Sequence, residues 1–184
     1  SQLLAIAEGG SCTYTEVDGI EHEAEILYFV DDKGWICKLY AYDLYQNDEV
    51  KQYAQYVSLE EIYHNCDMIT LHMPLTDDNF HLLNREAFAQ MKDGVVIINT
   101  ARGPLIDTEA LLDALESGKL AFYGADAFAT EPLPPQSRLR GLPGAVLTPH
   151  IAWTTKEALQ RLMDITTGNL RSFLTGKGEN IVNP

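Results

Sequence analysis

Four polar residues in this 184-residue sequence stand at or shortly after the ends of apolar runs, and their types suit acid–base chemistry. They are Asp43, Arg102, Glu131 and His150. Arginine binds carboxylates through a planar fork of donors, and histidine can move a proton near neutral pH. If the apolar runs are parallel strands, their carboxyl ends meet at one edge of a sheet, where ligands bind. The four groups would then serve acid–base chemistry on a small anion.

Each of these residues also has a simpler interpretation. Asp43 can cap a turn or a helix, or it can accept hydrogen bonds from an adenosine ribose at the end of a dinucleotide-fold strand. Arg102 can be an ordinary surface arginine, although the following Gly103 and Pro104 favour a guanidinium aimed into the crevice. His150 can be a core histidine, and Glu131 can begin a solvated loop. Taken singly, three of the four favour the simpler interpretation.

The elements that would position these residues alternate between strands and helices from residue 37 onward. Short apolar runs predict strands over 37–43, 67–74, 95–99, 120–128 and 145–150. Helical patterns that begin at the cap residues Ser58, Asn84, Asp107 and Thr154 predict helices over 57–66, 84–94, 107–118 and 154–174. Capping boxes join Ser58 to Glu61 and Thr154 to Glu157, Gly94 and Gly118 end their helices, and Gly168 is expected to loosen the last one.

This alternation predicts an α/β fold in which right-handed crossovers build a parallel sheet. The run 95–99 is apolar throughout, which is typical of a strand covered on both faces. The proline-rich segment 131–144 is expected to form an extended surface loop.

Residues 1–36 do not follow this pattern. They carry eight acidic residues and one lysine, which marks a possible boundary near residue 36. Residues 2–10 could form a short helix or strand, and 12–32 a hairpin that turns at Asp18-Gly19.

Composition excludes several classes of partner. The formal net charge of −14 argues against nucleic acid and anionic membrane surfaces, because both need a cationic face. Three cysteines without a CxxC spacing are typical of reduced thiols, so we expect a cytoplasmic protein. We find no signal peptide and no run long enough for a membrane helix.

Four segments together resemble the D-isomer-specific 2-hydroxyacid dehydrogenase family, whose members include D-lactate, glycerate (hydroxypyruvate) and D-3-phosphoglycerate dehydrogenases. They occur in the family's order, within a resemblance over about residues 35–184. The segments are CDMITLHMPLTDDNFHLLN, MKDGVVIINTARGPLIDTEALLDALESGKL, GADAFATEP and VLTPHIAW. The resemblance implies a partial Rossmann-like, doubly wound parallel sheet in which an atypical N-terminal segment replaces the first βα unit. The domains would be 1–36, an incomplete NAD-binding domain over 37–150, and a C-terminal helix and tail over 151–184.

The resemblance also implies a role for each site residue. Arg102 would hold the substrate carboxylate and polarise its keto oxygen, and His150 would exchange a proton with that oxygen. Glu131 would orient the imidazole and keep its pKa high enough for protonation, while NADH would supply the hydride. Asp43 would bind the adenosine ribose, which favours NAD over NADP. Further positions that match cofactor-lining residues are Met73, Pro74, Asn79, Thr100, Ala101 and Asp126, together with Arg102. We expect no metal site.

The sequence departs from the family before Asp43. A glycine-rich phosphate loop should lie about 20 residues upstream. Residues 19–35 instead contain no GxGxxG, and Glu21, Glu23 and Glu25 would repel a pyrophosphate. The N-terminal substrate lobe of relatives has no counterpart, so we expect weak NAD binding and little activity from this chain alone. The sheet would lack its usual central strand, a gap that N-terminal strands could fill or that could leave an edge open to another chain.

We therefore expect an NAD-dependent oxidoreductase of the D-2-hydroxyacid dehydrogenase type that acts on a small 2-keto or 2-hydroxy acid and forms a homodimer. The alternatives are a non-catalytic interaction module, since the family also contains transcriptional corepressors, and a defective fragment. The sequence does not specify which acid is the substrate, because the missing lobe largely determines specificity.

Overall fold

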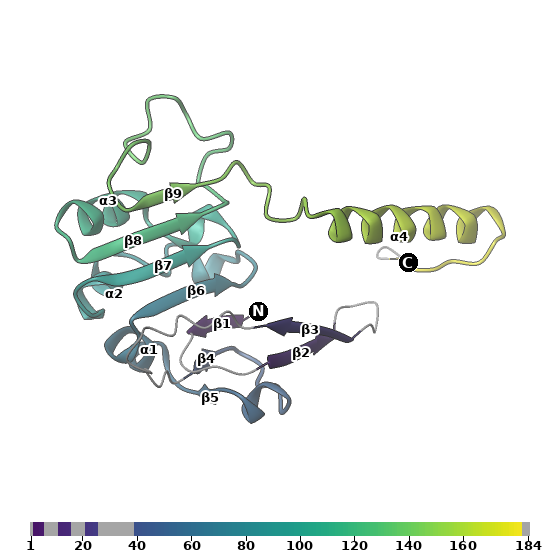
Figure 1. Ribbon diagram of the computed structural model, residues 1–184, viewed down its shortest axis with the longest axis horizontal. Coiled ribbons are helices and arrows are strands. Elements are labelled where there is room, and N and C mark those ends of the chain that lie inside the picture. The colour runs from purple at the N-terminus through teal and green to yellow at the C-terminus, as the bar shows by residue number, and fades with distance from the viewer. Residues whose placement is uncertain (1, 6–10, 16–20, 26–38, 182–184) are drawn as a thin grey trace. The chain divides into compact units, whose positions relative to one another are not determined.

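The structure is a computed structural model that describes residues 2–5, 11–15, 21–25 and 39–181 (Figure 1). Its strands are β1 (Gln2–Ala5), β2 (Ser11–Thr15), β3 (Glu21–Glu25), β4 (Tyr40–Tyr42), β5 (Gln55–Tyr56), β6 (Met68–His72), β7 (Val95–Asn99), β8 (Leu120–Ala125) and β9 (Ala145–Leu147). Its α-helices are α1 (Leu59–Asn65), α2 (Arg85–Gln90), α3 (Thr108–Glu116) and α4 (Lys156–Leu174). Short 3-10 helices are η1 (Val50–Gln52), η2 (Asp77–Asn79) and η3 (Gly103–Leu105). The α/β Rossmann-like class predicted from the sequence is confirmed.

Seven strands form one sheet in the order β5-β4-β1-β6-β7-β8-β9. The pairs β4–β5, β6–β7, β7–β8 and β8–β9 are parallel. Strand β1 is antiparallel to both of its neighbours, β4 and β6, so β4 and β6 point the same way. The carboxyl ends of β4, β6, β7, β8 and β9 therefore face one edge of the sheet, where ligands bind in this fold class.

The N-terminal strands account for the gap that the sequence left in the sheet. Strand β1 lies between β4 and β6, which is the first of the two alternatives considered above. Antiparallel neighbours need no helical crossover, so a short strand can take this place without a preceding βα unit. Strands β2 and β3 pair as the predicted hairpin, whose expected turn at Asp18-Gly19 lies outside the described residues.

The hydrophobic core lies between α1, α2, α3 and one face of the sheet (Figure 1). On β7 the side chains of Val95, Ile97 and Asn99 are buried, whereas those of Val96 and Ile98 are half-buried. The sequence predicted a strand covered on both faces, and the second face of β7 is only partly covered. The three helices pack along the face that carries the fully buried side chains.

Local sequence signals explain where the first three helices begin. Ser58 caps α1 in the predicted capping box, in which its hydroxyl accepts from Glu61 N and the Glu61 carboxylate accepts from Ser58 N. Asn84 caps α2 through Ala87 N, and Asp107 caps α3 through Glu109 N and Ala110 N. Each side-chain oxygen satisfies backbone donors that have no partner within the helix.

Tertiary packing changed one predicted helix end. Helix α2 ends at Gln90 rather than near Gly94, because Met91 is extended and its side chain is buried in the core. Gly94 instead takes the left-handed conformation, with φ of 79°, in the turn before β7, where its N–H donates to Lys119 O.

A local turn changed the start of another helix. Helix α4 is capped by Thr155, whose hydroxyl accepts from Ala158 N, and not by Thr154. The Thr154 hydroxyl donates to Ile151 O at 2.7 Å and so closes the preceding turn. Gly168 does not interrupt α4, which is continuous to Leu174.

The chain divides into two compact units, Ser1–Pro149 and His150–Pro184. The first contains both sheets and α1–α3, and the second contains α4. Among the described residues, no helix has the length and apolar character needed to cross a membrane.

Candidate active site

The predicted site residues of the first unit follow the carboxyl ends of its parallel strands. Asp43 follows β4, Met73 follows β6, Thr100 follows β7 and Asp126 follows β8. This arrangement is the one expected from the sequence, because parallel strands bring their carboxyl ends to one edge.

Asp43 combines a turn with a position suited to a ribose. Its carboxylate accepts from Tyr45 N at 3.0 Å, so the turn-capping interpretation is correct for that contact. The side chain is half-buried directly after β4. An acidic residue at this point of a dinucleotide fold is placed to accept hydrogen bonds from ribose hydroxyls.

The loop after β6 is closed by the side chain of Asn79. Its amide nitrogen donates to Pro74 O at 2.8 Å, and its amide oxygen accepts from Thr76 N at 2.8 Å. Met73 is buried in the hydrophobic core, whereas Pro74 is exposed. Asn79 therefore shapes the loop from within, and Pro74 lies on its accessible side.

The loop after β7 presents Arg102 at the surface. Arg102 is extended, with φ of −143° and ψ of 135°, and its Nη1 donates to Ala101 O at 2.7 Å. This contact holds the guanidinium against its own loop. From Gly103 the chain enters η3 and then α3, whose cap Asp107 fixes the far end of the segment.

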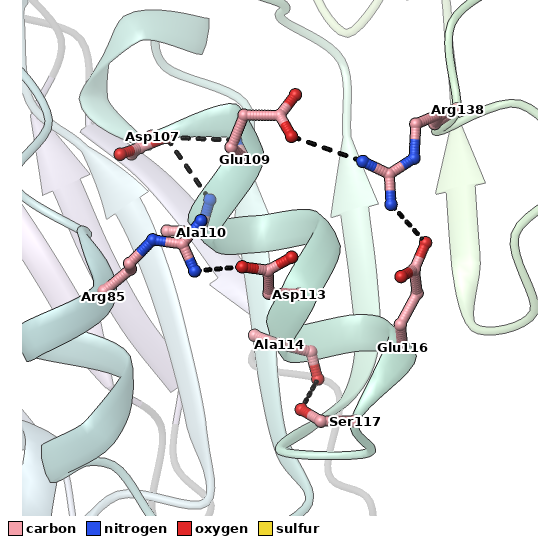
Figure 2. A network of polar contacts seen from close by, with 9 residues as sticks. All are labelled: Arg85, Asp107, Glu109, Ala110, Asp113, Ala114, Glu116, Ser117 and Arg138. Atoms are coloured by element: carbon pink, nitrogen blue, oxygen red, sulfur yellow. Dashed lines mark hydrogen bonds and ion pairs between the residues drawn. The ribbon is translucent and has the colours of Figure 1, made fainter.

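Helix α3 is anchored on two sides by ion pairs (Figure 2). Arg85 of α2 pairs with Asp113. Arg138 pairs with Glu109 at 3.3 Å and with Glu116 at 2.6 Å. These exposed pairs link α3 to α2 and to the loop that follows β8, so they border the site without belonging to it.

The Arg102 loop abuts the loop that carries Glu131. A Cβ added to Gly103 would lie 1.9 Å from Phe128 C and 2.2 Å from Ala129 N, so only glycine fits. The Glu131 carboxylate accepts from Phe128 N at 2.9 Å. The Glu131 side chain thus braces the backbone against which Gly103 packs, and the two loops meet at this contact.

Asp126 joins the ends of three strands. Its N–H donates to Asn99 O at 3.0 Å, and its buried carboxylate accepts from the Thr148 hydroxyl at 2.5 Å. Thr148 N also donates to Ala125 O at 2.9 Å. Asp126 therefore has a structural role beneath the edge at which the other groups collect.

His150 is the first residue of the second unit. It is exposed and has a left-handed backbone, with φ of 58°. Its carbonyl oxygen accepts from Trp153 Nε1 at 2.9 Å. The structure thus brings the loops of Arg102 and Glu131 together within the first unit, while His150 begins the second.

Asn99 was not among the predicted site residues, and Gly103 was predicted only to help aim Arg102, although both residues shape the site. A buried amide at the last position of an otherwise apolar strand was the available signal for Asn99. The contact that requires Gly103 joins residues far apart in the sequence, so no local pattern reveals it. Among the residues that the structure describes, no group of three His, Cys, Asp or Glu side chains is placed to hold a metal ion.

Known proteins are similar to this chain in sequence and in fold. A hydroxypyruvate reductase from Blautia hydrogenotrophica is 45% identical over 147 residues, which are 79% of this chain and 46% of that protein. An aromatic 2-oxoacid reductase from Clostridium sporogenes is 43% identical over 149 residues, covering 74% of this chain and 45% of that protein. The chain spans about half the length of these relatives.

Several solved structures are similar to this chain in fold. A D-lactate dehydrogenase from Treponema pallidum has a TM-score of 0.71 at 38% identity, over 76% of this chain and 46% of that one. The D-lactate dehydrogenase from Lactobacillus jensenii with NAD+ has a TM-score of 0.72 at 29% identity, over 79% of this chain and 48% of that one. Residues 32–152 match the NAD binding domain of the D-isomer specific 2-hydroxyacid dehydrogenases, and the chain therefore belongs to that family.

Proposed function

We propose that this chain forms the NAD-binding half of an oxidoreductase that transfers a hydride between NAD(H) and a small 2-keto or 2-hydroxy acid. The observation that carries the proposal is the contact between the Arg102 and Glu131 loops at the carboxyl edge of the sheet. The names of the relatives support the substrate class, since they are reductases and dehydrogenases of 2-oxo and 2-hydroxy acids.

In this proposal, different side chains bind the substrate and transfer the proton. Arg102 binds the substrate carboxylate through its guanidinium fork and polarises the keto oxygen. His150 gives a proton to that oxygen during reduction and takes it back during oxidation, and Glu131 orients the imidazole. When bound, NADH supplies the hydride, which no side chain can provide.

The residues present fit the ribose and nicotinamide portions of the cofactor better than its phosphates. Asp43 would hold the adenosine ribose, and the other cofactor-lining positions would be Met73, Pro74, Asn79, Thr100, Ala101, Arg102 and Asp126. The sequence before Asp43 lacks the glycine-rich turn that cradles a pyrophosphate. We therefore expect weak binding of NADH by this chain, and a micromolar affinity in calorimetric titration would contradict that expectation.

Oxidation of NADH in the presence of hydroxypyruvate, pyruvate or phosphohydroxypyruvate tests the activity. The Arg102→Ala variant should lose about 100-fold in kcat/KM, because a charge-assisted contact to the carboxylate is removed. Arg171→Ala, at an exposed arginine of α4, is the matched control and should retain the activity. Equal rates for Arg102→Ala and the unmodified chain would remove Arg102 from the mechanism. Absence of turnover with all three acids would refute activity of the chain alone.

We further propose that the protein is a cytoplasmic homodimer. Exposed apolar side chains along α4 supply surface that an interface would bury, and they include Leu159, Leu162, Met163, Leu170, Phe173 and Leu174. Sedimentation equilibrium should give twice the chain mass, and a monomer would contradict the proposal. We also propose the divisions 1–36, 37–150 and 151–184, for which limited proteolysis should cut near residues 36 and 150. The first division separates segments of one sheet, since β1 pairs with β4 and β6.

A further inference from the structure

Asn99 is a fully buried amide at the carboxyl end of β7, the strand that leads into Arg102. Its Oδ1 accepts from Ala101 N at 3.0 Å, and its Nδ2 donates to Arg102 O at 3.0 Å. The side chain thus bonds the backbone on both sides of the peptide that joins Ala101 to Arg102. Through this side chain, backbone groups two and three residues beyond Asn99 are hydrogen-bonded although they lie outside the strand.

The backbone of Asn99 is held as well. The Asn99 carbonyl oxygen accepts from Asp126 N at 3.0 Å, which ties its backbone to the end of β8. Tyr123, which is buried and pairs in register with Ile97, neighbours Asn99 on the same face of the sheet.

These contacts determine the path of the loop. A buried polar side chain that satisfies specific backbone groups allows few other arrangements of those groups, since each alternative leaves a donor or acceptor unpaired. With Ala101 N and Arg102 O both bound to one amide, Arg102 leaves the sheet in an extended conformation and Gly103 meets Phe128. The guanidinium then rests on Ala101 O, the carbonyl of the same loop.

We infer that Asn99 is a positioning residue that places the Arg102 guanidinium. The inference rests on the proposed function for the role of Arg102, and on the geometry above for the role of Asn99. Asn99 acts through Arg102 and makes no contact with substrate in this assignment. Its amide is required because one side chain must accept from Ala101 and donate to Arg102 at the same time.

The Asn99→Asp variant separates the two hydrogen bonds. An ionised carboxylate still accepts from Ala101 N but cannot donate to Arg102 O, whereas a protonated carboxyl can do both. Burial raises the pKa of a carboxyl, so acidification should restore the donor within an accessible pH range. Asn65→Asp is the matched control, since Asn65 Nδ2 also donates to a backbone carbonyl, Glu61 O at 2.8 Å, on an exposed helix away from the site.

Two measurements report on the loop without requiring activity. The first is the hydrogen-exchange protection of the Ala101 amide, and the second is the Arg102 Nε–Hε resonance in ¹H–¹⁵N spectra, assigned with Arg102→Lys. In Asn99→Asp at neutral pH the Arg102 resonance should move, and it should return on acidification. In Asn99→Leu the Ala101 protection should fall about tenfold, since a net hydrogen bond is lost, and acid should not restore it. If Asn99→Leu does not fold, the comparison of Asn99→Asp at neutral and acidic pH carries the test alone.

Kinetics then connect the loop to substrate. Relative to the unmodified chain at each pH, Asn99→Asp should raise KM for the keto acid about tenfold at neutral pH, and acid should reverse the effect. Unchanged Arg102 resonance and Ala101 protection in every Asn99 variant would overturn the inference. An inactive unmodified chain whose Asn99→Asp variant still shows the acid-reversible shift would refute activity of the chain alone and leave the positioning role supported.

Discussion

Replacement of Gly103 by alanine tests whether the two candidate site loops are locked together. The added Cβ would lie 1.9 Å from Phe128 C, 2.2 Å from Ala129 N and 2.3 Å from Phe128 O. Carbon atoms in contact are normally about 3.5 Å apart, so the backbones must separate by roughly 1.5 Å. Because the opposing atoms are backbone, no change of rotamer can relieve the overlap.

The size of the effect follows from how much the loop can yield. Phe128 and Ala129 border a cavity of about 330 Å³ between α3 and the loop that follows β8, and this space lets the loop move. We therefore expect Gly103→Ala to fold and to reduce the free energy of unfolding by about 3 kcal/mol, near the upper end for overpacking substitutions. For a protein of this size that corresponds to a fall in Tm of about 6–12 °C.

Urea unfolding followed by circular dichroism measures this cost. Gly124→Ala, in β8, is the control, because its Cβ would meet the end of the Ile98 side chain at 2.9 Å, which can rotate away, and the Phe122 ring at 4.0 Å. That variant should change the free energy of unfolding by less than about 1 kcal/mol. The error of such measurements is roughly 0.5 kcal/mol. If the free energies of unfolding of Gly103→Ala and Gly124→Ala differ by less than this, the predicted loop contact is wrong.

Further predictions concern helix α3 and the buried thiol of Cys66. Asp107→Ala should reduce the free energy of unfolding by about 1 kcal/mol in urea titrations, because two N-terminal donors of α3 lose their acceptor, and Asp107→Asn should recover most of it. Arg138→Met should leave the free energy of unfolding nearly unchanged despite its two ion pairs, since both are exposed, and a clear loss would assign them a role in packing. Burial raises the pKa of the Cys66 thiol to about 11, so iodoacetamide at pH 8 should leave it unmodified in a Cys12→Ser/Cys37→Ser background until urea unfolds the chain. The unfolded thiol ionises first, so stability should fall from about pH 9 to pH 11, and a Cys66→Ala variant should lack that part of the slope.

Much of the candidate site followed from local sequence signals. The strand over 95–99 and the cap at Asp107 were predicted at the residues where they occur, because an apolar run and a capping side chain act over a few neighbouring positions. The capping box of α1 was predicted for the same reason. The predicted end of α2 was wrong, because core packing of Met91 outweighed the helix-stop signal of Gly94.

The arrangement of the N-terminal segment required the tertiary structure. The sequence left open whether residues 2–10 would form a helix or a strand. A short strand can also pair with different neighbours in either direction, so its own residues do not fix its place in a sheet. The place of β1 between β4 and β6 depends on partners more than 30 residues away in the chain. His150 is a similar case. Its motif was recognised in the sequence, but only the structure shows that it lies in the second compact unit.

Sequence motifs were enough to predict which side chains this protein could use for chemistry. Its motifs identified the family, and the order of strands and polar residues predicted which groups follow the carboxyl ends of the strands. Tertiary structure alone decided how the Arg102 loop is held, through the buried amide of Asn99 and the contact of Gly103 with Phe128. The physical reason is that close packing and buried hydrogen bonds join residues from different elements, and such pairs leave no periodic pattern in the chain.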